Sequence, residues 1–304
     1  MWAVMDRGTN SCRLLLAEQG GAESGIKRVQ SFLRITRIGE GMRGQDRAIS
    51  PVALERTIAA LREFSLIIAG YQARDVIIVA TQAVREATNR DILVAGIKKE
   101  LNWELEILPG ESEARLSYLG AVAGLSLKKT ALVLDIGGGS TEFAWIGANG
   151  KFHAVSIAIG ALRLFESPRA DTEIHEIMQQ ALAKDGNTDG LRAAAASLLV
   201  GVGGTCTTAA AVNLSMAKYD SMKIQGHQLT IETIVNQYNM LNKIKACERL
   251  NIAGITKGRE DIIIPGLQIL IAAMKMLGGE VITISDQDLL YGVILNRLSP
   301  IPWL

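Results

Sequence analysis

The stretch that decides the fold is Ala131-Leu132-Val133-Leu134-Asp135-Ile136-Gly137-Gly138-Gly139-Ser140-Thr141-Glu142. Its apolar beginning predicts a buried strand that ends near Asp135. The three glycines that follow allow a turn whose backbone N–H groups approach a ligand closely, and a concave row of such donors favours an anion. An aspartate at the strand end can hold a hydrated divalent cation beside that anion. The stretch therefore contains the components of a metal–phosphate site.

A tight β-hairpin is the simpler interpretation of the same stretch. The residues Phe143-Ala144-Trp145-Ile146 have the character of a return strand, and the glycine-rich turn would join it to the first strand. The two interpretations are compatible, because a hairpin can carry a phosphate loop at its tip.

A second copy of the pattern near the N-terminus favours the phosphate-loop interpretation. The segment Ala3-Val4-Met5-Asp6-Arg7-Gly8-Thr9-Asn10-Ser11 again runs from an apolar strand through an aspartate to a glycine- and hydroxyl-rich turn, and Leu14-Leu15-Leu16 follows as the return strand. Two such loops, each opening one half of the chain, predict a duplicated fold with a cleft between the halves. A third glycine turn follows at Val200-Gly201-Val202-Gly203-Gly204-Thr205.

Composition sets the class of protein. With 304 residues, 48% of them apolar, the chain is long enough for a large core and two domains. The net charge is +1, from 32 basic and 31 acidic side chains, which argues against a surface built for bulk nucleic-acid binding. We therefore expect a local anion site and no nucleic-acid partner.

Cysteine usage and hydropathy bear on the compartment. Cys12, Cys206 and Cys247 are odd in number and far apart, which argues against a disulfide framework and fits a reducing compartment. The N-terminus enters a predicted strand directly, without the pattern of a signal peptide. The apolar run from Leu267 to Leu277 is too short to span a bilayer and is interrupted by Lys275. We expect a cytoplasmic protein without a membrane partner.

The chain alternates predicted strands and helices, which is typical of an α/β protein with parallel strands. The first half contains two or three strands over 1–49, a helix from Ser50-Pro51 to Gly70, a strand over 76–81, a helix over 89–101 capped by Asn89, a strand over 105–108 and a helix over 111–125. The second half contains strands over 131–136, 142–147 and 152–159, helices over 171–184 and 188–196, a helix from about Thr207, a helix over 230–240, a long helix after Pro265, a strand over 281–284 and a final helix to about Leu298.

Several charged residues beside these turns could carry chemistry. Arg85 is either a solvated arginine or a phosphate clamp, because a planar guanidinium matches phosphate oxygens. Glu113 lies at a predicted helix start, where it is either a capping carboxylate or a general base for water; Glu111 is the better cap by position. Asp135 and Asp6 are candidates for holding a metal.

Glu142 and the three histidines are the remaining residues considered for a role in chemistry. Glu142 lies on the far side of its turn and could orient water or metal. The three histidines, His153, His175 and His227, lie outside the glycine-rich loops, so we expect them to be structural. No Walker A sequence is present, which excludes a P-loop enzyme, and no Gly-x-Ser-x-Gly elbow is present.

Taken together, the motifs resemble one family, the exopolyphosphatase and guanosine pentaphosphate phosphohydrolase (Ppx/GppA) family. A triple-glycine loop alone is shared with sugar kinases, whereas the arginine block and the Glu-Ala-Arg-Leu block are much more specific. The motifs that carry the resemblance are Asp6-Arg7-Gly8-Thr9-Asn10-Ser11, Ala80-Thr81-Gln82-Ala83-Val84-Arg85-Glu86-Ala87, Gly110-Glu111-Ser112-Glu113-Ala114-Arg115-Leu116, Asp135 to Glu142, Gly201 to Thr205, Pro265-Gly266 and Ser285-Asp286.

The resemblance implies two RNase H-like domains of the actin, hexokinase and Hsp70 type with an interdomain cleft. The first domain would comprise residues 1–121 and the second residues 122–304, with the final helix, about 287–298, packing back on the first. It also implies hydrolysis of a terminal phosphoanhydride with bound magnesium, or manganese as the alternative, and a homodimer.

The resemblance further implies roles for individual residues. Glu113 would be the general base, Arg85 would contact the phosphate being cleaved, Asp135 would hold the metal, and Glu142 would help to position water or metal. Asp6 is a further candidate for holding the metal. The predicted phosphate-binding residues are Gly8, Thr9, Asn10, Ser11, Gly137, Gly138, Gly139, Ser140, Thr141, Gly203 and Gly204. Arg7 departs from the family pattern, which usually has an apolar residue at that position.

These motifs predict an exopolyphosphatase that removes terminal phosphate from inorganic polyphosphate. Hydrolysis of guanosine pentaphosphate to the tetraphosphate is the alternative, because it would use the same base, metal and loops. A non-catalytic nucleotide or alarmone sensor on the same fold is a third hypothesis, which the intact Glu113 and Asp135 argue against. With 5% aromatic residues no guanine pocket is identifiable, and the candidates for a basic track along the cleft are Arg13, Arg43, Arg163, Lys257 and Arg259.

Overall fold

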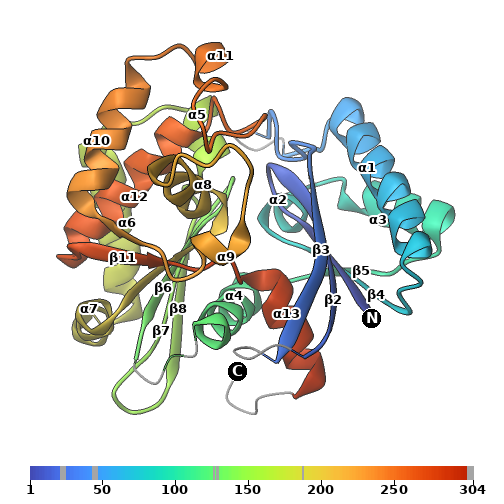
Figure 1. Ribbon diagram of the computed structural model, residues 1–304, viewed down its shortest axis with the longest axis horizontal. Coiled ribbons are helices and arrows are strands. Elements are labelled where there is room, and N and C mark those ends of the chain that lie inside the picture. Colours follow the sequence, from blue (N-terminus) through green and yellow to red (C-terminus); the bar gives the residue numbers. More distant parts are fainter. Residues whose placement is uncertain (21–24, 43–46, 126, 128–129, 187, 300–304) are drawn as a thin grey trace.

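The computed structural model describes residues 1–20, 25–42, 47–125, 127, 130–186 and 188–299. It forms two lobes, each built around one mixed β-sheet (Figure 1). The first sheet comprises β1 (Trp2–Arg7), β2 (Ser11–Gln19), β3 (Ile26–Ile35), β4 (Asp75–Ala80) and β5 (Leu105–Ile107). The second comprises β6 (Leu132–Ile136), β7 (Thr141–Ile146), β8 (Phe152–Ile157), β9 (Leu199–Val202), β10 (Gln228–Thr230) and β11 (Val281–Ile284).

Helices cover both sheets. Those of the first half of the chain are α1 (Pro51–Gly70), α2 (Gln82–Glu86), α3 (Arg90–Leu101) and α4 (Gly110–Gly124). Those of the second half are α5 (Ala161–Glu166), α6 (Asp171–Asp185), α7 (Thr188–Ser197), α8 (Gly203–Asn213), α9 (Ser221–Ile224), α10 (Ile231–Asn242), α11 (Ala246–Arg249), α12 (Ile263–Leu277) and α13 (Leu289–Leu298).

The two sheets repeat one plan. The order is β3-β2-β1-β4-β5 in the first and β8-β7-β6-β9-β11 in the second, where β10 adds an outer strand. In both, the first three strands along the chain are antiparallel neighbours, and the fourth pairs parallel with the first. This is the arrangement of an RNase H-like domain, so the predicted duplicated α/β fold is confirmed.

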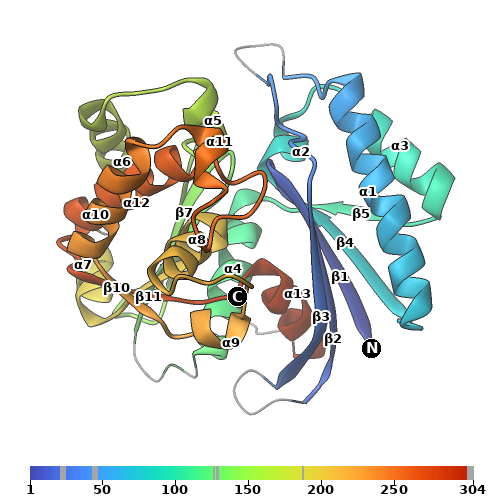
Figure 2. The same cartoon turned by 45° about the horizontal axis from the view of Figure 1, so that its top comes forward.

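Two helices fill the space between the sheets. Ala114, Tyr118 and Ala121 of α4 pack on the second sheet, whereas Leu290 and Val293 of α13 pack on the first. The two helices lie side by side in both views (Figures 1 and 2). The packing therefore groups the helices differently from a division of the chain between residues 121 and 122, because α4 belongs with the second sheet and α13 with the first.

Strand alternation determines which face each side chain reaches. On β1, Ala3 and Met5 point into the core under α1 and α3, whereas Val4 points toward α13. Asp6 follows on the face of Val4, which is the face turned toward the second domain. By the same alternation Asp135 lies on the face of β6 that α4 covers. The two aspartates are therefore equivalent in the two domains.

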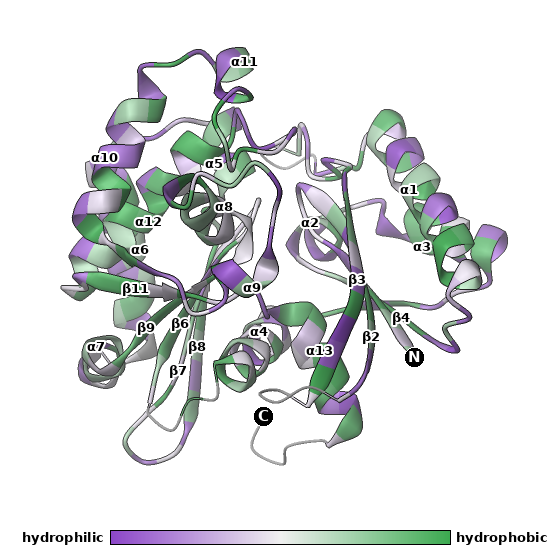
Figure 3. Cartoon of the chain, viewed as in Figure 1, coloured by the Kyte–Doolittle hydropathy of each residue, from purple (hydrophilic) through white to green (hydrophobic). Residues whose placement is uncertain are grey.

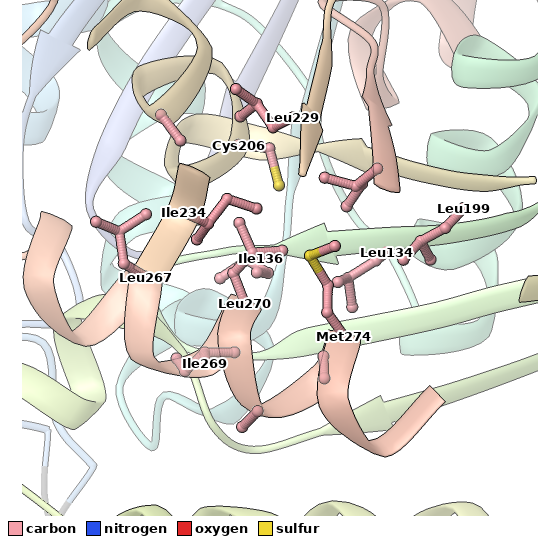
Figure 4. Packing of buried hydrophobic residues seen from close by; sticks show 14 of the residues in the cluster. Leu134, Ile136, Leu199, Cys206, Leu229, Ile234, Leu267, Ile269, Leu270 and Met274 are labelled. Carbon is pink, nitrogen blue, oxygen red and sulfur yellow. The ribbon is translucent and has the colours of Figure 1, made fainter. Parts of the chain in front are cut away.

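The opposite face of the second sheet carries the largest apolar core. Figure 4 shows Leu134 and Ile136 of β6 packed near Leu267, Leu270 and Met274 of α12. Figure 3 shows hydrophobic residues concentrated on α12 and in the strands that it covers. Burying this much apolar surface holds β6 rigidly, and with it the turn that follows the strand.

Several elements differ from the sequence prediction. Helix α8 begins at Gly203, four residues before the predicted start, so the third glycine turn is in part a helix N-terminus. The strand that precedes it, β9, is only four residues long and was not predicted. Asn89 stands at the start of α3, but its side chain exchanges hydrogen bonds with the backbone of Ile49 instead of capping the helix. Arg43, a candidate for the predicted basic track, lies outside the described residues.

Two further observations concern cysteines and hydropathy. Cys12 and Cys206 are buried and Cys247 is exposed, and all three are free thiols. Across the described part of the chain, none of the helices combines the length and the apolar character that crossing a membrane would require.

Candidate active site

A cavity of about 380 Å³ lies between the two domains. It joins the turns that follow β1 and β6, named here the first loop (residues 8–11) and the second loop (residues 137–140). Most predicted site residues line it, namely Asp6, Gly8, Thr9, Asn10, Ser11, Glu113, Asp135, Gly137, Gly138, Gly139, Ser140, Glu142, Gly203 and Gly204. Two predicted residues, Arg85 and Thr141, are not among the lining residues.

The first loop presents backbone donors to this cavity. The N–H of Gly8 donates to the carbonyl of Ser11 at 3.0 Å and closes the turn. The carbonyls of Thr9 and Asn10 accept hydrogen bonds of 2.8 to 3.1 Å from the backbone of residues 36–39. Since a trans peptide carries its C=O and N–H on opposite sides, the N–H groups of Asn10 and Ser11 are directed away from that segment.

The second loop is built in the same way. Gly137 N–H donates to the carbonyl of Ser140 at 2.9 Å, and the carbonyls of Gly137 and Gly138 accept bonds of 2.8 to 3.0 Å from the backbone of residues 161–163. Gly139 accepts from Arg163 Nε at 3.0 Å. The N–H groups of Gly138, Gly139 and Ser140 therefore point the opposite way, and none of them has an acceptor within the described residues. Such a row of free donors is an anion site.

The second loop packs closely against the first, which explains why Gly138 and Gly139 have no side chain. A Cβ on Gly138 would lie 3.1 Å from the backbone nitrogen of Asn10, and one on Gly139 would lie 2.0 Å from Oε1 of Gln82. Any larger residue would push the loops apart. The side-chain amide of Asn10 is buried here with neither its oxygen nor its nitrogen hydrogen-bonded. A buried amide without partners is costly, so the loop is built for a ligand.

The third glycine turn adds a helix N-terminus. Helix α8 begins at Gly203 without a side-chain cap, so the first N–H groups of the helix and its dipole are available to an anion. A Cβ on Gly204 would lie 2.0 Å from Nη2 of Arg259, so this guanidinium rests against the glycine. Arg259 lines the cavity, and burial together with the charge of Arg13 lowers its pKa to about 10. No hydrogen bond or ion pair of its side chain is present within the described residues.

Glu113 enters the cavity from the first turn of α4. Its Oε2 atom accepts a hydrogen bond of 3.0 Å from Nη1 of Arg85, which also donates to the carbonyl of Leu108 at 2.6 Å. Burial and the charge of Glu142 raise the pKa of Glu113, and Arg85 lowers it in part. Glu111, by contrast, pairs with Arg115 one turn further along the helix and faces solvent. Helix geometry thus separates the two carboxylates.

Two more carboxylates stand opposite Glu113. Asp135 accepts a hydrogen bond of 2.8 Å from the hydroxyl of Ser117, and burial followed by the charge of Glu142 raises the pKa of Asp135 to about 7. Glu142 accepts a hydrogen bond of 2.7 Å from Ser156, and burial raises its pKa as well. Three neighbouring carboxylates with raised pKa values, two of them buried and Asp135 partly exposed, form a concentration of negative charge that a cation would relieve.

The chemistry of this donor set fits a hard divalent cation. Within the described residues no group of three or more His, Cys, Asp or Glu side chains is arranged to hold a metal ion. Of the three carboxylates, Asp135 and Glu142 lie two residues before and two residues after the second loop in the sequence. Magnesium is commonly bound in this way, by one or two carboxylates, water and substrate phosphates.

Asp6 is placed differently from the prediction of a metal ligand. Its Oδ2 atom accepts hydrogen bonds from Arg13 at 2.7 and 3.2 Å, and the same arginine pairs with Asp288 at the start of α13. Burial raises the pKa of Asp6 and Arg13 lowers it in part, so this arginine, which Asp6 shares with Asp288, offsets some of its charge. The Oδ1 atom of Asp6 has no partner. Arg13 lines the cavity, but its guanidinium is occupied by the two aspartates.

Thr141 lies behind the second loop. Its side chain is fully buried, and its hydroxyl donates to the carbonyl of Ile159 at 2.6 Å. The side chain braces the loop, and its proton is not available to a phosphate. Ser140, one residue earlier, does line the cavity.

Sequence and structure comparisons agree with this geometry. A sequence model of the Ppx/GppA phosphatase family matches residues 17–300. The chain belongs to this family. The resemblance predicted from the motifs is therefore confirmed, and the RNase H-like topology described above is that of a Ppx/GppA protein.

Among curated relatives, this Ppx/GppA chain is 31% identical to exopolyphosphatase 2 of Mycobacterium tuberculosis, over 97% of each chain. It is 32% identical to a bifunctional 3-dehydroquinate synthase/phosphatase of Fusobacterium nucleatum, over 98% of this chain and 46% of that protein. It is 28% identical to a guanosine-5'-triphosphate,3'-diphosphate pyrophosphatase of Aeromonas hydrophila, over 98% of this chain and 60% of that protein. The chain thus spans less than two thirds of the length of the last two.

Solved structures give the same result. The crystal structure of an exopolyphosphatase from Cytophaga hutchinsonii matches with a TM-score of 0.85 and 25% identity, over 99% of both chains. The Aquifex aeolicus Ppx/GppA family member matches with a TM-score of 0.75 and 26% identity, over 98% of this chain and 97% of that one.

The structure also adds residues to this Ppx/GppA site that sequence reasoning missed. Ser117 and Ser156 orient two of the carboxylates, and Tyr219 lines the cavity beside Asp286. Ser117 could have been found, because it lies four residues after Glu113 and therefore on the same face of the helix. Ser156 reaches Glu142 as its partner in the β7–β8 pair. No local signal marks Tyr219, which reaches the cavity only through the tertiary fold.

Proposed function

We propose that this Ppx/GppA protein is an exopolyphosphatase that hydrolyses the terminal phosphoanhydride of inorganic polyphosphate, with water activated by Glu113. The observation that carries the proposal is that Glu113, held by Arg85, lines the same cavity as both glycine loops. The full-length similarity to a mycobacterial exopolyphosphatase supports polyphosphate as the substrate.

The reaction follows from the positions of these groups. The N–H groups of the first and second loops hold the terminal phosphates and neutralise their charge. The Glu113 carboxylate accepts a proton from water as the water oxygen bonds to the terminal phosphorus. The phosphoanhydride P–O bond then breaks, and the shortened chain leaves as an anion next to Arg259 and the N-terminus of α8.

Magnesium, with manganese as the alternative, would complete this site. Asp135 and Glu142 would hold the ion, which when bound would neutralise phosphate charge and lower the repulsion within the carboxylate cluster. Asp6 would support the site through Arg13 and not as a ligand, because its charge is already paired.

Polyphosphate needs positive charge along its path, and the structure limits where this can be. Of the five predicted track residues, Arg13 and Arg259 line the cavity, whereas Arg163 pairs with Glu86 outside it. Lys257 is exposed and does not line the cavity, and Arg43 lies outside the described residues. Arg28 lines the cavity as well, but it pairs with Asp286, as Arg13 does with Asp6 and Asp288. Among these three cavity-lining arginines, Arg259 is therefore the one that would contact the substrate directly.

Guanosine pentaphosphate hydrolysis stays the second candidate, because aromatic residues of both domains line the cavity and could receive a base. Phe32 and Tyr219 both line it, and Tyr219 is 43% exposed. An exposed aromatic ring beside a phosphate site is a stacking surface for a nucleobase. Tyr219 is therefore the residue that would contact the nucleoside of guanosine pentaphosphate.

The deciding experiment measures phosphate release in the presence of magnesium from long-chain polyphosphate and from guanosine pentaphosphate, for the wild type, Glu113→Gln and Glu111→Gln. Release from polyphosphate that Glu113→Gln abolishes and Glu111→Gln preserves supports the proposal. Release from the nucleotide alone selects the second candidate. Activity that survives in Glu113→Gln refutes the assignment of the base, and binding without release indicates a sensor.

Two further expectations stay predictions. Sedimentation at several protein concentrations tests the homodimer, and cell fractionation tests the cytoplasmic location. Neither property is needed for the chemistry proposed here, because every group it uses comes from one chain.

A further inference from the structure

Arg7 is a fully buried arginine at the end of the central strand of the first sheet. In the sheet it lies opposite Cys12 of β2 on one side and Ala80 of β4 on the other, and the residue has no exposed surface. Strand alternation sends it to the face opposite Asp6, into the apolar core beneath α1. This is the position where the family pattern led us to expect an apolar residue.

The guanidinium of Arg7 has no compensating charge. Its Nη2 atom donates to the hydroxyls of Thr57 at 3.1 Å and Thr36 at 3.4 Å, while Nε and Nη1 have no partner. No carboxylate forms an ion pair with it within the described residues. Burying an unpaired charge costs several kcal/mol in proteins, so this arginine opposes folding.

The position of Arg7 suggests what offsets this cost. Gly8, the next residue, begins the first loop, and Thr36 donates its backbone N–H to the carbonyl of Asn10 at 3.1 Å. The arginine thus lies under the segment that orients the loop. Burial raises the pKa of Asp6 and of Cys12, and the charge of Arg7 lowers both in part. Its field therefore favours negative charge on either side of β1.

We propose that Arg7 is a positioning residue of the first loop, whose unpaired charge beneath the loop strengthens phosphate binding there at the expense of folding stability. The proposal rests on the proposed function only in that the first loop binds phosphate. A charge in the interior acts through a low dielectric and escapes screening by salt, unlike the charge of an exposed arginine such as Arg62. Arg7 would thus attract phosphate without touching it.

Three variants separate this role from a structural one. Arg7→Met removes the charge and keeps a long apolar side chain, and Arg7→Lys keeps the charge. Arg62→Met is the matched control, because Arg62 carries the same charge on the solvent side of α1 and pairs there with Glu55 and Glu100. Each is unfolded with denaturant and titrated with imidodiphosphate, a non-hydrolysable analogue of a phosphoanhydride in which an NH group replaces the bridging oxygen, without metal and at low and high salt.

The proposal expects opposite changes in the two measurements. Arg7→Met should unfold at a higher denaturant concentration than the wild type, yet bind imidodiphosphate about tenfold more weakly, with the same ratio at both salt concentrations. Arg7→Lys should keep most of the affinity, and Arg62→Met should change neither affinity nor its salt dependence.

Other results overturn it. Unchanged affinity in Arg7→Met refutes the electrostatic role. Lower stability and equal loss of affinity in Arg7→Met and Arg7→Lys show that the arginine only ties Thr36 to Thr57. A wild type that does not bind imidodiphosphate refutes phosphate binding at the loop. A wild type that binds it but releases no phosphate from either substrate refutes the proposed hydrolysis and leaves the inference about Arg7 intact.

Discussion

Arg85 holds Glu113 in the cavity with a hydrogen bond of 3.0 Å from Nη1 to Oε2, and the same nitrogen is fixed by the carbonyl of Leu108 at 2.6 Å. Arg85 does not itself line the cavity. Its position therefore suggests a role different from direct contact with phosphate: it orients the proposed base and stabilises the charged form of that base.

The first prediction concerns the pH dependence of phosphate release in Arg85→Met. Arg85 lowers the pKa of Glu113, which burial and Glu142 raise, so its removal raises that pKa further. Because the base must be deprotonated, the rate limb that rises with pH should move to higher pH. At neutral pH we expect a rate loss of about tenfold or more, since one pKa unit is a factor of ten in the charged form.

The control for this prediction is Arg115→Met. Arg115 lies on α4 like Glu113, but it pairs with the exposed Glu111. Its pH–rate profile should match that of the wild type. A profile of Arg85→Met that keeps its shape and only loses height would show that Arg85 acts by contacting substrate and not through Glu113.

The second prediction concerns folding stability without metal. Asp135 has a folded-state pKa of about 7 against 3.8 when unperturbed, so in this window the folded state binds more protons than the unfolded state. The free energy of unfolding should therefore fall as pH rises from about 4 to about 7. In Asp135→Asn, whose amide oxygen can still accept from Ser117, this slope should be shallower in denaturant titrations across the window.

Asp75→Asn is the matched control, because Asp75 is exposed at the start of β4. It should keep the wild-type slope. An unchanged slope in Asp135→Asn would mean that Asp135 is not the group that titrates.

The fold was largely predictable from local signals. Short apolar runs such as 76–81 and 105–108 located strands of the first sheet, and Ser50-Pro51 located the start of a helix that covers it. The duplicated Asp–Gly pattern predicted the repeated topology. The packing of α4 on the second sheet could not be predicted from its own sequence, because an apolar helix face can pack on either sheet.

The residues of the site were predictable where a local turn or helix start determines their position. The two loops, Glu113 and Asp135 were predicted from turns and helix starts, and the structure gathers them around one cavity. The contact of Arg85 with Glu113 was not predicted, because the two residues lie 28 positions apart in the sequence. The pairing of Asp6 with Arg13 and Asp288 depends on α13 returning from the far end of the chain.

The third prediction concerns magnesium. Above the pKa of Asp135, the carboxylate cluster is most highly charged, so added magnesium should raise the free energy of unfolding of the wild type. The same addition should have little effect on Asp135→Asn, and little effect on the wild type below that pKa, where protons replace the cation. Thermal or denaturant unfolding with and without magnesium, and after chelation, measures this. Equal stabilisation of both proteins would place the metal elsewhere.

The fourth prediction concerns Arg259 and the glycine beneath it. In Gly204→Ala the new Cβ would lie 2.0 Å from the guanidinium, so Arg259 must move away from the N-terminus of α8. We expect the substrate concentration for half-maximal phosphate release to rise about tenfold, with a smaller change in the maximal rate, because a charge-assisted contact contributes about 1.5–3 kcal/mol.

Arg259→Ala should reproduce the effect of Gly204→Ala, and the double variant should be no worse than either single one, because both remove one contact. Additive losses in the double variant would contradict this explanation. Arg249→Ala is unsuitable as a control, since Arg249 is buried and bonded to the backbone of Leu241 and Glu260. Arg297→Ala, exposed on α13, is the suitable one.

The last prediction concerns the crossing of α4 and α13, where the two domains meet. A Cβ on Gly292 would lie 1.9 Å from the carbonyl oxygen of Leu116, and one on Gly120 would lie 2.1 Å from that of Asp288. Backbone atoms on both sides cannot yield without moving a helix, so Gly292→Ala should lower the free energy of unfolding by about 1–3 kcal/mol or more.

Gly96→Ala is the matched control, because its Cβ would meet only Ile58 Cδ1, at 3.5 Å. In α3 that change should stabilise by about 0.5–1 kcal/mol through helix propensity. Denaturant unfolding measures both, and equal effects of the two substitutions would show that the crossing is not tightly packed.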